Sequence, residues 1–139
     1  MFEPRKFSDI KIGERASIKR SYNERDVELF IAVSQDYNPI HCSEEYAKTT
    51  RFGRRIVPGL LTASMISGVL GTKLPGYGTI YMSQELKFHY PVYFGDELEC
   101  EVEVIDKIEA KKIIILDARI KNNDGKIVVS GKAIVMLES

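Results

Sequence analysis

Asp36 and His41 are the side chains of this sequence whose types and spacing best suit acid–base chemistry. Four residues, Tyr-Asn-Pro-Ile, separate them in a stretch rich in turn-forming residues. A carboxylate and an imidazole can each accept or release a proton, and such a pair accelerates proton transfer by about 10² to 10⁴-fold when it is well positioned. Taken alone, an Asp and a His at this spacing are more often a solvated acid and a structural histidine, so the surrounding sequence must decide.

The backbone that carries the pair is expected to be irregular rather than one face of a helix. A helix is predicted over about residues 24–35, because Asn23 suits an N-cap, acids follow in the first turn, and apolar residues recur at helical spacing. The pair at 38–39, Asn-Pro, disfavours helical backbone at its first residue and indicates a turn. Ser43 can then cap a second short helix.

A second stretch, residues 56–61 (Ile-Val-Pro-Gly-Leu-Leu), begins an apolar helix at Gly59. Apolar residues lie almost all round this helix, which predicts burial on several sides. The first N–H groups of a helix have no intrahelical acceptor and stabilise negative charge. The two stretches together therefore predict an acid–base pair facing an oxyanion site.

The second half of the chain changes to the alternation of β-strands, with the turn signal Asn-Asp-Gly at 123–125. Several antiparallel strands with one apolar face, after one apolar helix, predict an α+β fold in which a sheet wraps around that helix. We expect a single domain over residues 1–139. Strands are predicted over residues 15–21 (a short edge strand), 79–90, 97–105, about 112–121 and 127–137.

Composition argues against several classes of function. Twenty basic and twenty acidic residues give no net charge, so neither nucleic acid nor a membrane is an expected partner. The first residues carry charges where a signal peptide needs an apolar core, so we expect a cytoplasmic location. The longest uncharged run, 56–72, is shorter than the roughly 20 residues of a membrane span. Cys42 and Cys100 lack metal or redox spacing, so we expect reduced thiols and no metal. The predicted acid–base chemistry requires no cofactor, and none is expected.

Four motifs together resemble the MaoC-like (R)-specific enoyl-CoA hydratases. They are residues 36–41, 56–61, 63–67 and 91–96, and the resemblance covers the chain from about residue 15 to its end. It implies the hot dog fold, a long helix enveloped by an antiparallel sheet. It also implies a homodimer with edge-to-edge sheets and a site near the interface. Members add water in the syn sense to trans-2-enoyl-CoA and form (R)-3-hydroxyacyl-CoA.

The resemblance also implies roles for individual residues. Asp36 and His41 would bind and activate the water and return a proton to the α-carbon. The N–H of Gly59 would bind the thioester oxygen. Asn38 would orient the water or a side chain of the site, and Ser67 matches a family serine that supports the aspartate.

Other features of the sequence leave alternatives open. Arg51, Arg54 and Arg55 are candidates for binding CoA phosphates, although a short basic run is usually a solvated loop. Pro58 stands where several family members carry a histidine, which we interpret as tuning of the loop. His89 falls on the polar face of a predicted strand, where it would meet solvent or a dimer partner.

Three other functions remain compatible with such a fold, because a fold does not determine its chemistry. A 3-hydroxyacyl-carrier-protein dehydratase would perform the same chemistry on a different carrier. An acyl-CoA thioesterase is a weaker alternative, because thioesterase relatives typically place their carboxylate elsewhere. A non-catalytic acyl-CoA-binding module would bind its ligand equally well after substitution of Asp36 by Asn.

Overall fold

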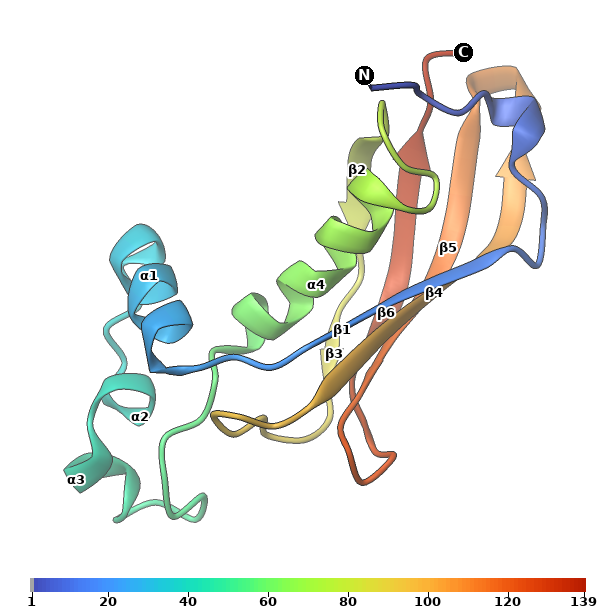
Figure 1. Cartoon of the computed structure of the whole chain (residues 1–139). Coiled ribbons are helices and arrows are strands. Elements are labelled where there is room, and N and C mark those ends of the chain that lie inside the picture. Colours follow the sequence, from blue (N-terminus) through green and yellow to red (C-terminus); the bar gives the residue numbers. More distant parts are fainter. Residues whose placement is uncertain (1) are drawn as a thin grey trace.

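The structure, a computed structural model, describes residues 2–139 and contains a curved antiparallel sheet, a long helix in its concave face and a helical arm (Figure 1). Short 3-10 turns lie at Phe7–Asp9 and Glu109–Lys111. The helices and strands are β1 (Arg15–Arg20), α1 (Glu24–Ser34), α2 (Pro39–Cys42), α3 (Glu44–Ala47), α4 (Gly59–Thr72), β2 (Ile80–Gln84), β3 (Lys87–Phe88), β4 (Leu98–Ile108), β5 (Ile113–Lys121) and β6 (Ile127–Met136). This is the α+β hot dog arrangement that the resemblance implies.

The sheet has the strand order β1-β4-β5-β6-β2, with β3 also paired to β6, and its pairs are antiparallel. The strands expected over 15–21, 97–105, 112–121 and 127–137 are confirmed, and β1 lies at an edge as predicted. Their buried side chains alternate along β4 and β5, as half-buried strands require.

The continuous strand predicted over 79–90 is wrong, because the chain divides there into β2 and β3. A register shift interrupts β2 between Tyr81 and Ser83. Beyond it, the backbone of Glu85 crosses closely over β6, and a Cβ on Gly131 would lie only 1.7 Å from the Glu85 carbonyl oxygen. The glycine therefore permits a close approach that the period-two pattern does not reveal.

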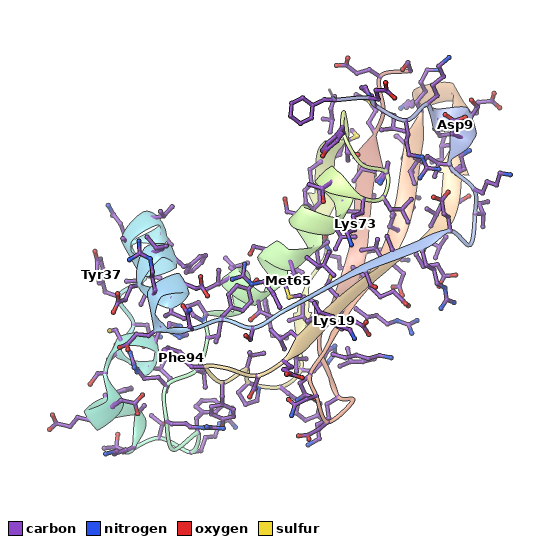
Figure 2. The ribbon with its side chains drawn as sticks, viewed as in Figure 1. Asp9, Lys19, Tyr37, Met65, Lys73 and Phe94 are labelled. Atoms are coloured by element: carbon purple, nitrogen blue, oxygen red, sulfur yellow. The ribbon has the colours of Figure 1, made fainter. Side chains whose placement is uncertain are left out.

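Helix α4 packs on the sheet through one face and leaves another face open. Met65, Ile66, Val69 and Leu70 are buried against the sheet, and Met65 is labelled in Figure 2. Leu60, at the start of the helix, is exposed, as are several small residues further along. The expectation of burial on several sides is therefore wrong for a single chain. None of the helices within residues 2–139 combines the length and apolarity needed to cross a membrane.

Helices α1, α2 and α3 form an arm, residues 24–47, which projects away from the sheet (Figure 1). The predicted capping of α1 is confirmed: Asn23 Oδ1 accepts from the Asp26 N–H, and the Asp26 carboxylate accepts from the Asn23 N–H. Ser43 caps α3, also as predicted. Helix α2 was not predicted. His41 lies on this short helical turn, whereas irregular backbone was expected there. Proline at the first helical position explains why this turn can follow Asn38.

Candidate active site

Asp36 lies in the connection between α1 and α2, directly after a residue with left-handed backbone, Gln35. Its N–H donates to Ser34 Oγ at 3.1 Å, and its Oδ1 accepts the N–H of Asn38 at 3.2 Å. These local bonds fix the orientation of the carboxylate, as in other turns that aspartate stabilises. The second oxygen, Oδ2, faces His41.

The imidazole of His41 is nearly buried and is held by a backbone carbonyl. Its Nδ1 lies 2.8 Å from the carbonyl oxygen of Ile56. Because a carbonyl oxygen can only accept, Nδ1 carries the proton and Nε2 is the nitrogen available for chemistry. Nε2 lies 3.9 Å from Asp36 Oδ2. This separation is too long for a direct hydrogen bond but allows one water molecule to lie about 2.8 Å from both atoms.

Asn38 supports the turn between the two side chains. Its Oδ1 accepts the N–H of Ile40 at 3.3 Å and so caps α2. Its own N–H donates to Asp36, so Asn38 touches the carboxylate through backbone and α2 through its side chain. The predicted role of Asn38 in orienting water stays a prediction.

A cavity of about 640 Å³ opens beside Asp36, a size usual for small-molecule sites. It is bounded by the arm, by the connection 51–58, by the first turn of α4 and by the segment around β3. Asp36 and Gly59 both line it, and Nε2 of His41, which is not itself among the lining residues, lies 3.9 Å from Asp36 Oδ2. The wall consists of Phe30, Ser34, Asp36, Arg51, Phe52, Ile56, Val57, Pro58, Gly59, Leu60, Thr62, Phe88, His89, Tyr90, Pro91, Val92 and Val129.

Gly59 is the first residue of α4, and within residues 2–139 its N–H has no hydrogen-bond acceptor. The aromatic ring of Phe88 lies against it, and a Cβ at position 59 would be 2.8 Å from ring carbons Cδ1 and Cε1. The glycine therefore allows the ring to approach the helix start. The resulting cavity wall combines an unpaired donor with an apolar surface.

Three further residues of the wall, Thr62, Phe88 and His89, were not predicted as site residues. His89 is exposed, as expected, and its Nε2 lies 2.8 Å from Ser130 Oγ; it also lines the cavity. Thr62 is buried, and its hydroxyl has no partner among residues 2–139. The alternation of residues 79–90 placed His89 on a polar face but gave no indication that this face borders a cavity.

Ser67 lies apart from the acid–base pair in the single chain. It is exposed on α4 and lines a separate shallow groove with Leu60, Tyr81 and Met82. Its predicted support of Asp36 is therefore not seen within one chain and stays a prediction.

The three predicted arginines have different surroundings. Arg51 lines the cavity and stacks on Phe52, with 4.8 Å from its guanidinium carbon to the ring centre. Arg54 stacks on Tyr93 at 4.0 Å. Arg55 instead pairs with Glu24 and Glu44 of the arm, and the hydrogen bond to Glu44 raises the pKa of Arg55. Of the three, Arg51 alone reaches the cavity.

Metal-binding side chains do not gather in the part of the chain that the structure describes: no three His, Cys, Asp or Glu residues form a cluster there. Cys42 is an exposed free thiol, and Cys100 is a buried one in the core. Burial raises the pKa of the Cys100 thiol to about 12.

The chain is similar to known proteins in sequence and in fold. The MaoC like domain family matches residues 7–125. An (R)-specific enoyl-CoA hydratase of Aeromonas caviae is 43% identical over 128 residues, which are 92% of this chain and 96% of that protein. One of Rhodospirillum rubrum is 44% identical over 131 residues, 94% of this chain and 90% of that protein. The solved structure of an (R)-hydratase from A. caviae involved in PHA biosynthesis superimposes with a TM-score of 0.90 at 43% identity, covering 92% and 97% of the two chains.

Proposed function

The chain belongs to the MaoC-like domain family, and from this premise we propose that it is an (R)-specific enoyl-CoA hydratase. It adds water to trans-2-enoyl-CoA and forms (R)-3-hydroxyacyl-CoA without a cofactor. The observation that carries the proposal is the 3.9 Å separation of Asp36 Oδ2 and His41 Nε2 beside a cavity with an unpaired helix-start N–H.

In this proposal one water molecule binds between Asp36 Oδ2 and His41 Nε2. As its oxygen forms a bond to C3 of the enoyl thioester, one of its protons passes to the pair. The electrons of the C2–C3 double bond move onto the thioester oxygen, which gives an enolate. C2 then takes a proton from the pair, so that water has been added and both side chains return to their starting state. Because Nδ1 is bound to the Ile56 carbonyl, Nε2 is the histidine nitrogen that exchanges protons.

The enolate oxygen needs a donor, and the N–H of Gly59 is suited to this role. It lies at the positive end of α4 and has no other acceptor within residues 2–139. A fixed donor at a developing oxyanion lowers the activation free energy by on the order of 3 kcal/mol. The apolar wall around it holds the acyl chain, and Arg51 at the cavity is the arginine best placed to meet a CoA phosphate.

We also propose that the chain acts as a homodimer. Support comes from apolar side chains that stay exposed around edge strand β2 and the first turn of α4, including Leu60, Tyr81, Met82 and Phe88. Contiguous exposed apolar surface is typical of protein interfaces. Pairing of this edge with a second copy would also cover Ser67.

The direct test measures hydration of crotonyl-CoA by wild type, Asp36→Ala and His41→Ala. We expect loss of the conjugated enoyl absorbance, an (R) product, and a decrease of kcat/KM by at least about 10²-fold in either variant. Asp124→Asn, a change of an exposed aspartate in the β5–β6 turn, is the matched control and should keep full activity.

Other outcomes would identify the alternatives. Release of free CoA thiol, with no hydroxyacyl product, would replace the hydratase by a thioesterase. Turnover restricted to acyl-carrier-protein substrates would indicate a dehydratase of carrier-bound acyl groups. Tight binding without turnover, equal in wild type and Asp36→Asn, would indicate a non-catalytic module.

A further inference from the structure

The backbone at Ile56 determines which way His41 points. The carbonyl of Ile56 accepts a hydrogen bond from Nδ1–H of His41. The N–H of Ile56 donates to the carbonyl of Ile40, at 3.2 Å, in the helix that carries His41. Residue 56 therefore contacts α2 twice. A shift of this backbone would free the ring and remove Nε2 from its place opposite Asp36.

Arg55, the preceding residue, anchors this backbone to two helices of the arm. Its Nε donates to Glu44 at 2.6 Å, and one terminal nitrogen donates to Glu24 at 3.2 Å. Its guanidinium also stacks on Phe94, labelled in Figure 2, at 4.7 Å from the ring centre. The hydrogen bond to Glu44 raises the pKa of Arg55, and the same bond lowers the pKa of Glu44.

This cluster differs from an isolated surface ion pair, which contributes little. The side chain of Arg55 is only 16% exposed, and its fork contacts carboxylates from two separate elements together with an aromatic ring. Glu24 is the first residue of α1, whose far end leads to Asp36, and Glu44 is the first residue of α3, which follows His41. One guanidinium thus joins the elements on both sides of the acid–base pair.

On the sheet side, the same segment is fixed by backbone contacts. The N–H of Val57 donates to the carbonyl of Val92 at 2.7 Å, and Ile56 forms an isolated β-bridge with Tyr93. Residues 55–57 are therefore a junction between the arm, which carries Asp36 and His41, and the body, which carries the cavity and Gly59.

We propose that Arg55 is a positioning residue for the acid–base pair. Through Glu24 and Glu44 it holds the arm against residues 55–57. The Ile56 carbonyl then keeps its hydrogen bond from the Nδ1–H of His41, and Nε2 faces Asp36. The inference rests on the proposed hydratase function. It also gives Arg55 a role different from the predicted contact with CoA phosphates, since its Nε and one terminal nitrogen donate to the two glutamates.

Kinetics with two substrates separate these roles. Crotonyl-CoA carries phosphates, whereas the crotonyl thioester of N-acetylcysteamine carries none. Arg55→Ala should lower kcat about tenfold or more on both substrates with KM changed by less than about twofold, because misplaced catalytic groups slow the chemical step. A rise in KM confined to crotonyl-CoA, with kcat unchanged, would overturn the proposal in favour of phosphate binding.

Further variants show whether the effect is specific. Arg55→Lys should recover part of kcat, because an ammonium group can pair with one glutamate but cannot span both. Glu44→Gln, which keeps the arginine, should also lower kcat, by less than Arg55→Ala does. The control is Arg15→Ala, since Arg15 also bridges two glutamates, Glu101 at 3.6 Å and Glu103 at 3.2 Å, on strands β1 and β4. It should leave kcat unchanged; an equal loss there would overturn the proposal.

Long-range ¹H–¹⁵N spectra of the imidazoles provide a readout that does not depend on turnover. The chain has two histidines, His41 and His89, so a His89→Gln variant assigns both signals. Wild type should show the His41 proton on Nδ1, and Arg55→Ala and Glu44→Gln should show a mixture of tautomers. An unchanged His41 tautomer in both variants would overturn the proposal. An arginine-dependent tautomer in a protein that hydrates no crotonyl thioester would instead refute only the hydratase function.

Discussion

Gly59 is confined by the ring of Phe88, so a single methyl group tests the proposed oxyanion site. A Cβ at position 59 would lie 2.8 Å from two ring carbons, and the ring, 53% exposed, can turn away into the cavity. We expect Gly59→Ala to lower kcat/KM by about tenfold or more while changing the free energy of unfolding by less than about 1.5 kcal/mol. Steady-state kinetics and urea unfolding measure the two effects. The double variant Gly59→Ala, Phe88→Ala should regain part of the activity; no recovery would contradict the steric explanation.

Thr62 provides a second test at the level of single atoms. Its hydroxyl is buried and unpaired within residues 2–139, and the nearby carbonyl of Pro58 already accepts the N–H groups of Leu61 and Thr62. An unpaired buried hydroxyl destabilises by about 1 to 3 kcal/mol, so Thr62→Val should unfold at equal or higher urea concentration. Thr72 on the same helix donates to Gly68 at 2.7 Å, so Thr72→Val should be the less stable variant. The reverse order would show that Thr62 has a partner.

The two cysteines differ in exposure and should differ in chemistry. Cys100 is buried and Cys42 exposed, so one thiol of the native protein and two of the unfolded protein should react with a disulfide reagent. The pKa of Cys100 is about 12 in the fold, against an ordinary value of 9.0. Between these values only the unfolded chain loses the proton, so the contribution of this thiol to the free energy of unfolding is fully present below pH 9 and is lost as pH rises toward 12.

A variant isolates the contribution of Cys100. Cys100→Val should show a shallower fall above pH 9 than wild type in urea unfolding. Partial burial also raises the pKa of the Tyr81 hydroxyl to about 12, from 10.0, so some decrease above pH 10 should remain in the variant, reduced because Tyr81 is 40% exposed. Identical slopes in wild type and Cys100→Val would contradict burial of the thiol.

At the residue scale, the sequence was sufficient to predict that Asp36 and His41 lie close together and that Gly59 begins a helix, because both depend on residue type and short spacing. The catalytic roles of these three residues stay predictions. It could not predict that Nδ1 of His41 is bound by Ile56, since that contact crosses 15 residues and depends on the path of the connection between them. It also could not predict that the ring of Phe88 packs against Gly59, because Phe88 lies in β3, far from Gly59 in the sequence.

At the element scale, α1 is stabilised at its start by reciprocal bonds between Asn23 and Asp26. Asn23→Ala removes the side-chain acceptor and should lower the free energy of unfolding by about 1 kcal/mol. Chemical denaturation measures the loss, and Asn123→Ala in the exposed β5–β6 turn is the control. A loss below about 0.3 kcal/mol would show that packing rather than capping determines where α1 begins.

The helices and strands were predictable where a cap or a clean alternation was present. Strands β4, β5 and β6 and the start of α1 follow from such local signals. Strand 79–90 was predicted as continuous because its alternation is unbroken, yet Glu85 crosses Gly131, a contact between distant parts of the chain. Helix α2 was missed because four residues are too short for a helical period.

At the scale of the whole molecule, one apolar helix followed by amphipathic strands was enough to predict a sheet wrapped around α4. The sequence overstated the burial of that helix, because periodicity distinguishes apolar from polar positions but not which apolar positions a single chain covers. The apolar side chains left exposed on α4 and β2 give the proposed homodimer a specific surface.

Met82 is the best site for testing that surface. It lies in edge strand β2, is 54% exposed, and neighbours Tyr81 and Leu60 along the groove that contains Ser67. A buried, unpaired carboxylate is costly, so Met82→Glu should shift sedimentation from dimer toward monomer while far-UV circular dichroism stays unchanged. Ile12→Glu, at a more exposed apolar position outside the sheet, is the control and should remain dimeric. If the interface also completes the acyl site, kcat/KM of Met82→Glu should rise with protein concentration as dimer forms; a fully active monomer would show that the cavity of one chain is sufficient.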